Sequence, residues 1–281
     1  MNTDIKHLGE LKGKVLVFGG VYSNLQALEE LQFIANKLNV SAQNIICTGD
    51  VVGYCASPSQ CLDLIENWGV HVIKGNVEEN LINGTDDCGC NFEEGSRCDI
   101  FSKQWFPFAV TKMTEKNMQY LQTLPDRIEF EFAGKKVHVL HGAHDNISEF
   151  VYASEPWATK LQEINKVNAD VVLAGHCGFP FGASDGEKFW LNSGVIGMPA
   201  NDGTPRVWFM ILDEAEGKFT YSHCNFQYDS FEANQQMLEN DLPYSYAETL
   251  LSGIWDNHEI LPEAEIAQEG VALSFENQID F

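Results

Sequence analysis

The chain has 281 residues, 44% of them hydrophobic, so it is long and apolar enough to bury a large core. Its 41 acidic and 17 basic residues give a formal net charge of −24 at pH 7. This charge repels nucleic-acid backbones and anionic membranes, and it excludes both as general partners. A small anionic ligand would need a local attraction, such as a bound cation.

The cellular location can be predicted from what the sequence lacks. Residues 1–14 hold no apolar run long enough for a signal peptide, and no later segment reaches the length of a membrane span. We therefore expect a cytoplasmic protein. Its eight cysteines are then more typical of free thiols or metal ligands than of disulfides.

Strands and helices alternate along the chain, as in an α/β sandwich. The first predicted elements are a strand at residues 14–18, a helix capped by Ser23 or Asn24 and reaching Leu38, a strand at 44–48, a helix from Ser57 to about Trp68, and a strand at 70–73. Later come a hairpin of 127–132 and 136–140, a helix at 156–166, and strands at 171–174, 189–192, 206–212 and 219–224. This order predicts two facing sheets with helices outside.

The last fifty residues differ in character from the rest. A polar helix, a break at Leu242-Pro243, an apolar stretch and an acidic tail follow one another. Such a short segment can hardly form its own core. We therefore predict one main domain over residues 1–226 and a helical extension, residues 227–281, packed on the same domain.

Five short motifs each follow a predicted strand. They read Phe18-Gly19-Gly20-Val21-Tyr22-Ser23-Asn24, Gly49-Asp50-Val51-Val52-Gly53-Tyr54, Gly75-Asn76-Val77-Glu78, His141-Gly142-Ala143-His144 and Gly175-His176-Cys177-Gly178. Their order and spacing over about residues 14–213 resemble the calcineurin-like metallophosphoesterases, in particular the small bacterial members. The family pattern runs Asp-x-His, Gly-Asp, Gly-Asn-His-Asp/Glu, His and Gly-His-x-His. The resemblance implies a four-layer α/β/β/α sandwich.

The resemblance also implies a metal site. Members of the family bind two divalent cations that share an aspartate and activate water against a phosphoester. Asp50 matches the shared aspartate, and Asn76, His141 and His176 match the other ligands of the second metal. The resemblance thus implies one divalent cation, Mn, Fe or Zn, at this retained site.

The ligands of the first metal are absent. Gly20 stands at the aspartate position, Tyr22 at the histidine position and Gly178 at the final histidine position. Val77 replaces the histidine that contacts phosphate in the family, and valine can neither donate a proton nor polarise an oxygen.

Two functions stay open from the sequence. The chain could be a metal-dependent phosphoester hydrolase with a reduced or remodelled centre, in which Tyr22 and His144 contact phosphate or a replacement ligand. It could instead be a catalytically silent regulatory protein that binds a phosphate or a nucleotide. The four retained ligands favour the enzyme, whereas Val77 and Gly20 favour the regulator. Either way the expected partner is a small phosphorylated molecule.

A cysteine-rich segment at residues 87–99 departs from the family pattern. Cys88, Cys90 and Cys98 lie within eleven residues, but their spacing is not that of a zinc finger. Together with Cys177 or Cys55 they could form a second metal or redox site, where soft sulfur ligands would select zinc or iron. The alternative is a surface lid with free thiols.

Overall fold

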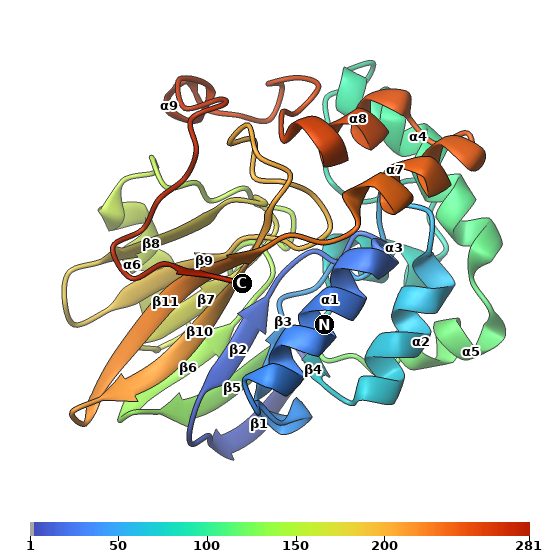
Figure 1. The fold of residues 1–281 in the computed structure, drawn as a ribbon. Coiled ribbons are helices and arrows are strands. Elements are labelled where there is room, and N and C mark those ends of the chain that lie inside the picture. The colour runs from blue at the N-terminus through green and yellow to red at the C-terminus, as the bar shows by residue number, and fades with distance from the viewer. Residues whose placement is uncertain (1–2) are drawn as a thin grey trace.

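The computed structural model describes residues 3–281, and Met1 and Asn2 lie outside the described residues. Two six-stranded sheets face each other, with helices on their outer sides (Figure 1). The strand orders are β1-β5-β6-β7-β9-β8 and β12-β11-β10-β2-β3-β4. The strands are β1 (Ile5–Glu10), β2 (Val15–Phe18), β3 (Ile45–Cys47), β4 (His71–Val72), β5 (Arg127–Phe132), β6 (Lys135–Val139), β7 (Val171–Ala174), β8 (Pro180–Ser184), β9 (Phe189–Ser193), β10 (Val207–Ala215), β11 (Lys218–Phe226) and β12 (Ile279–Asp280).

Helices cover the outer faces of the two sheets, and those predicted at residues 24–38, 57–68 and 156–166 are among them. They are α1 (Leu25–Lys37), α2 (Pro58–Trp68), α3 (Asn76–Asn83), α4 (Arg97–Lys112), α5 (Glu115–Leu121), α6 (Trp157–Lys166), α7 (Ser230–Glu239), α8 (Tyr244–Ser252) and α9 (Glu263–Ile266). Of the two candidate caps for α1, Asn24 is the one whose side chain accepts a hydrogen bond, from the N–H of Ala27 at 3.2 Å. Proline stands at the first position of α2.

Apolar side chains fill three layers between these elements. Val17, Phe130 and Val171 lie among the residues packed between the two sheets. A second cluster joins α1 and α2 to the outer face of the β2 sheet, and a third joins α6 to the other sheet. The predicted four-layer α/β/β/α sandwich is therefore confirmed.

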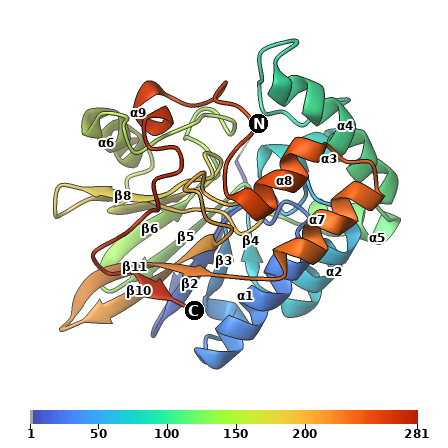
Figure 2. The ribbon, with the colours of Figure 1, turned by 45° about the horizontal axis from the view of Figure 1, so that its top comes forward.

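The C-terminal extension packs on this sandwich, as Figure 2 shows for α7, which lies beside α1 and also contacts α8. Ala233 and Leu250 belong to the same apolar cluster as α1. The extension is not entirely helical, because its last residues form β12, which pairs in parallel with β11. None of the helices between residues 3 and 281 combines the length and apolar character needed to cross a bilayer.

The packing of the sheets predicts a pH-dependent stability. His223 on β11 is buried, stacks on Phe275 with ring centroids 4.1 Å apart, and has its pKa lowered to about 4 by burial. The unfolded chain takes up this proton near pH 6.5, so stability falls as the pH drops from about 6.5 to about 4.

We expect the metal-free protein to lose about 3 kcal/mol of unfolding free energy to this group over that interval. In His223→Gln this contribution to the loss should disappear. Unfolding free energies from urea titrations at pH 7 and pH 4 would measure the difference. If the unfolding free energy fell equally with pH in both proteins, His223 would not be the group responsible.

Candidate metal site and adjoining pocket

Four of the predicted ligands come together at one edge of the two sheets. Asp50 follows β3, His141 follows β6, His176 follows β7, and Asn76 begins α3. Asp50 and His176 both have left-handed backbone conformations, with φ of 57° and 62°. Non-glycine residues adopt this conformation at a cost that surrounding structure must sustain, and such residues gather at functional sites.

The lone pairs of these ligands point toward one another. His141 Nδ1 lies 2.7 Å from the carbonyl oxygen of Thr48, so this nitrogen carries the proton and Nε2 is free to accept. His141 Nε2 in turn lies 3.0 Å from Asn76 Oδ1, 3.2 Å from His176 Nδ1 and 3.3 Å from Asp50 Oδ2. A single proton on His141 Nε2 could form a hydrogen bond in only one of these three contacts.

The orientation of Asn76 follows from its other contacts. Its Nδ2 donates to the carbonyl oxygen of Cys88 at 2.9 Å and lies 3.2 Å from Cys90 Sγ, so its Oδ1 faces the histidines. The buried Nε2 of His176 has no hydrogen-bond partner among the described residues, and Nδ1 points to the cluster. Oxygen and imidazole donors arranged in this way fit a divalent metal ion.

A buried glutamate supports this edge of the sheets. Glu78 accepts hydrogen bonds from the N–H groups of Asp50, Gly75 and Val52 at 2.8, 2.8 and 3.1 Å. Burial, with help from the charge of Asp50, raises the pKa of Glu78 to about 7. The sequence analysis assigned no role to Glu78, although it closes the third motif.

The charges of the ligands balance within the cluster. Burial alone would raise the pKa of Asp50, but the facing His141 and His176 outweigh it and hold that pKa below its ordinary value. Burial and the neighbouring His141 lower the pKa of His176 to about 3, so its ring stays neutral and able to bind a metal.

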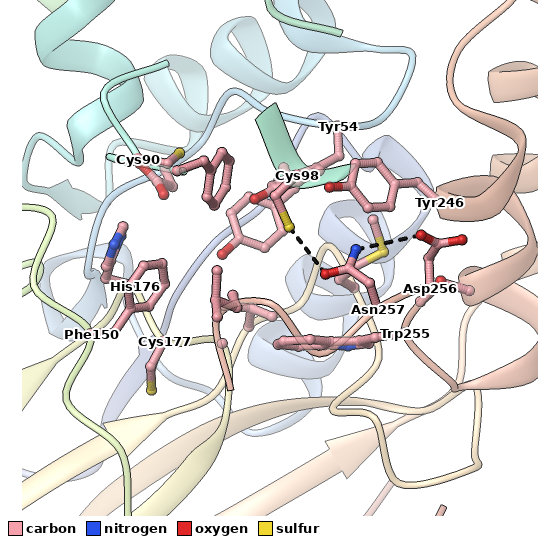
Figure 3. A pocket seen from close by; sticks show the side chains of 18 residues that line it. Tyr54, Cys90, Cys98, Phe150, His176, Cys177, Tyr246, Trp255, Asp256 and Asn257 are labelled. Atoms are coloured by element: carbon pink, nitrogen blue, oxygen red, sulfur yellow. Dashed lines mark hydrogen bonds between the residues drawn. The ribbon is translucent and has the colours of Figure 1, made fainter. Parts of the chain in front are cut away.

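Beside the cluster lies a pocket with aromatic walls (Figure 3). His176 and Phe150 stand at one end of it, and Tyr246 and Trp255 from the C-terminal extension stand toward the other. Tyr22 and Asp50 line it as well. The pocket therefore joins the metal-ligand cluster to the extension.

Aromatic rings lie beside two of the positions at which the family's ligands are missing. A Cβ atom on Gly20 would lie 2.6 Å from the ring of Tyr22, and one on Gly178 would lie 3.4 Å from the indole of Trp255. Tyr22 is itself accommodated by glycines, because a Cβ on Gly197 would approach its Cβ to 2.6 Å. Gly20 thus leaves room for the ring of Tyr22, whereas a Cβ on Gly178 would lie at an ordinary contact distance from Trp255.

His144 lies apart from this pocket. Its Nδ1 is 2.8 Å from a carboxylate oxygen of Asp145, and it lines a second hollow together with Asp145, Asn146 and the metal-ligand residue His141. Its predicted contact with phosphate stays a prediction. Tyr22, by contrast, lines the aromatic pocket next to Asp50.

The cysteines of the variable segment divide between two places. Cys88 and Cys90 have their sulfur atoms 2.8 Å apart, whereas Cys98 Sγ lies 3.5 Å from Asn257 Oδ1. Cys177 Sγ accepts from Asn192 Nδ2 at 3.2 Å. Within residues 3–281, one group of three or more His, Cys, Asp or Glu residues has its ligand atoms within 4.8 Å of one another, and it consists of Asp50, His141 and His176. The cysteines form no second group of this kind, and all are buried rather than at the surface of a lid.

The sandwich and its cluster of metal ligands define a phosphoesterase-like protein. Residues 14–217 match the family model described as the calcineurin-like phosphoesterase superfamily domain, and the chain belongs to that superfamily.

Similar proteins cover nearly the same length of chain. An uncharacterized protein of Methanocaldococcus jannaschii is 25% identical over 260 residues, which cover 86% of this chain and 99% of the relative. A metallophosphoesterase from Sphaerobacter thermophilus has a TM-score of 0.67 at 22% identity, over 87% of this chain and 100% of its own. A hypothetical protein from Pyrococcus horikoshii OT3 has a TM-score of 0.70 at 18% identity, over 86% of this chain and 99% of its own. The two solved structures support the fold.

Proposed function

We propose that the protein is a metal-dependent phosphoester hydrolase with one divalent cation, Mn, Fe or Zn, held by Asp50, Asn76, His141 and His176. The observation that carries the proposal is the convergence of four lone-pair donors on one point, with Asn76 and His141 each oriented by a second hydrogen bond. A bound cation would supply Lewis-acid activation of water and of a phosphoryl oxygen.

The residues of the chain have distinct parts in this proposal. Asp50 provides the negative charge that a cation needs, and the neutral ring of His176 provides a nitrogen ligand. Burial alone would lower the pKa of His141, but the facing Asp50 outweighs it and raises that pKa, so a cation bound at its Nε2 would take the place of a proton. Tyr22 stands at the pocket wall next to Asp50, and burial raises its pKa well above the ordinary value. It would therefore act as a neutral hydrogen-bond donor toward phosphate and not as a base.

A regulatory protein that binds a phosphate or a nucleotide without hydrolysis is the second candidate. It is favoured by the absence of ligand side chains at Gly20 and Gly178, beside which the rings of Tyr22 and Trp255 lie, and by Val77, which offers no proton. Such a protein would bind the same ligands with the same cation, so turnover distinguishes the two candidates.

We also propose a cytoplasmic location and a small phosphorylated substrate as partner. The eight cysteines are all free, which suits a reducing compartment. The charge of −24 argues against nucleic acids and anionic membranes as partners.

Metal stoichiometry tests the proposed centre. Because Gly20, Tyr22 and Gly178 offer no ligands for a first metal, we expect at most one tightly held cation per chain by elemental analysis after dialysis. An exposed-site control, Asp241→Asn, should keep that cation. Two retained cations bridged by Asp50 would show that the ligand assignment is wrong.

A further inference from the structure

We propose that the aromatic pocket beside the metal-ligand cluster binds the ester group of the substrate, and that this group is flat, aromatic and uncharged. The substrate would then be a phosphodiester, which carries a single negative charge on its phosphate. This inference rests on the proposed hydrolase function, since it assigns the remainder of the substrate to the space next to the cation.

Rings from four separate segments form the walls of the pocket. Tyr22 and Tyr54 meet edge to face with centroids 4.6 Å apart, and Tyr54 meets Tyr246 of α8 in the same way at 5.1 Å. Phe150 lies against the ring of His176 at 4.2 Å. Aromatic walls favour flat ligands, because rings prefer offset or edge-to-face contacts with other rings.

The position of the pocket connects these walls to the reaction centre. Asp50 and His176 are lining residues, so a group in the pocket lies directly beside the proposed cation. The space between its walls comes to about 740 Å³ when the open solvent at the mouth is counted, so the pocket is open to a ligand from outside.

The charge of the pocket favours an uncharged ester group. None of the 18 described residues that line it is a lysine or an arginine. Asp256, at the end formed by the extension, is paired with Arg97 and leaves little free charge there. A phosphate dianion would meet only the cation as a counter-charge, beside the carboxylate of Asp50, whereas a monoanion needs less compensation.

The C-terminal extension holds its part of the wall in a fixed position. The backbone N–H of Trp255 donates to Asn201 Oδ1 at 2.8 Å, and its indole Nε1 donates to the carbonyl oxygen of Pro199 at 2.8 Å. The ring of Phe179 packs on the indole with centroids 4.9 Å apart. Trp255 is therefore the anchored ring that we expect to select the ester group.

Phosphonate ligands test the pocket, because their P–C bond keeps the aromatic group attached even in an active enzyme. By calorimetry, the Mn-loaded protein should bind methyl phenylphosphonate about tenfold more tightly than methyl methylphosphonate. It should also bind methyl phenylphosphonate more tightly than the doubly charged phenylphosphonate. Trp255→Leu should remove most of the preference for the phenyl group, so that the two affinities approach each other.

Two further variants keep the test decisive. Tyr246→Leu alters the opposite wall and should also reduce the preference, which covers the case that Trp255→Leu fails to fold. Tyr244→Ala, on the same helix but exposed, should retain it. Equal affinity for the phenyl and methyl ligands in the unmodified protein would overturn the proposal, as would tighter binding of the dianion.

Hydrolysis of methyl phenyl phosphate, measured in parallel, separates this inference from the proposed function. A phenyl preference without any hydrolysis would support the pocket and reject the hydrolase. Hydrolysis with no phenyl preference would support the hydrolase and reject the pocket.

Discussion

Replacing Asp50 should abolish both metal binding and phosphodiester hydrolysis. Its carboxylate is the negatively charged member of the ligand cluster, and it lies 3.3 Å from His141 Nε2. We expect Asp50→Ala to lower kcat/KM at least a thousandfold, since a bound metal supplies several kcal/mol of transition-state stabilisation, roughly one factor of ten per 1.4 kcal/mol. Elemental analysis should find the cation lost as well.

Asp50→Asn provides a matched variant, because asparagine tolerates the left-handed conformation, at φ 57°, better than alanine does. It removes the charge while it keeps the size of the side chain. The exposed Asp241→Asn controls for a general change in charge. Robust turnover that survives Asp50→Ala would refute the site.

Glu78→Ala should destabilise the whole protein strongly. The substitution leaves the N–H groups of Asp50, Val52 and Gly75 without their acceptor in a fully buried place. A buried donor left unpaired costs about 1–3 kcal/mol, so we expect the unfolding free energy to fall by about 3 kcal/mol or more. Urea unfolding monitored by circular dichroism would measure the loss.

The neighbouring Glu79→Ala is the control for this prediction. Glu79 is on the same first turn of α3 but is exposed, so its removal should change the unfolding free energy by less than about 0.5 kcal/mol. Similar unfolding curves for Glu78→Ala and Glu79→Ala would show that the three backbone contacts contribute little.

Strands with continuous apolar runs were predictable, and strands held by edge pairing were not. The run of β2 is entirely buried, and this continuous apolar run located the strand within one residue. In β1 only the side chains at its first and fourth positions, Ile5 and Leu8, are partly buried, so its sequence lacks the alternation of a half-buried strand. Its pairing with β5, far along the chain, holds it in the sheet. The two residues of β12 likewise depend on the edge of β11.

The metal-ligand cluster was predicted from the resemblance of its motifs to the calcineurin-like metallophosphoesterases, and the fold brings its members together because they follow strands that end at the same edge. Asp50, His141 and His176 each sit at such an end. The contact of Trp255 with Gly178 could not be predicted in this way, because the two residues are 77 positions apart and Trp255 lies in a loop of the extension. Loop contacts of this range leave no periodic signal.

The extension is fastened at both ends, and this has a consequence for ligand selectivity. It leaves the sandwich after β11 and returns to pair with the same strand through Ile279–Asp280, with the N–H of Phe281 donating to the carbonyl oxygen of Asn225 at 3.0 Å. A loop closed in this way has already lost much of its conformational entropy before any ligand arrives. The wall that carries Trp255 is thus preorganised, and it should discriminate ester groups by fit to a rigid shape and not by adapting to each one.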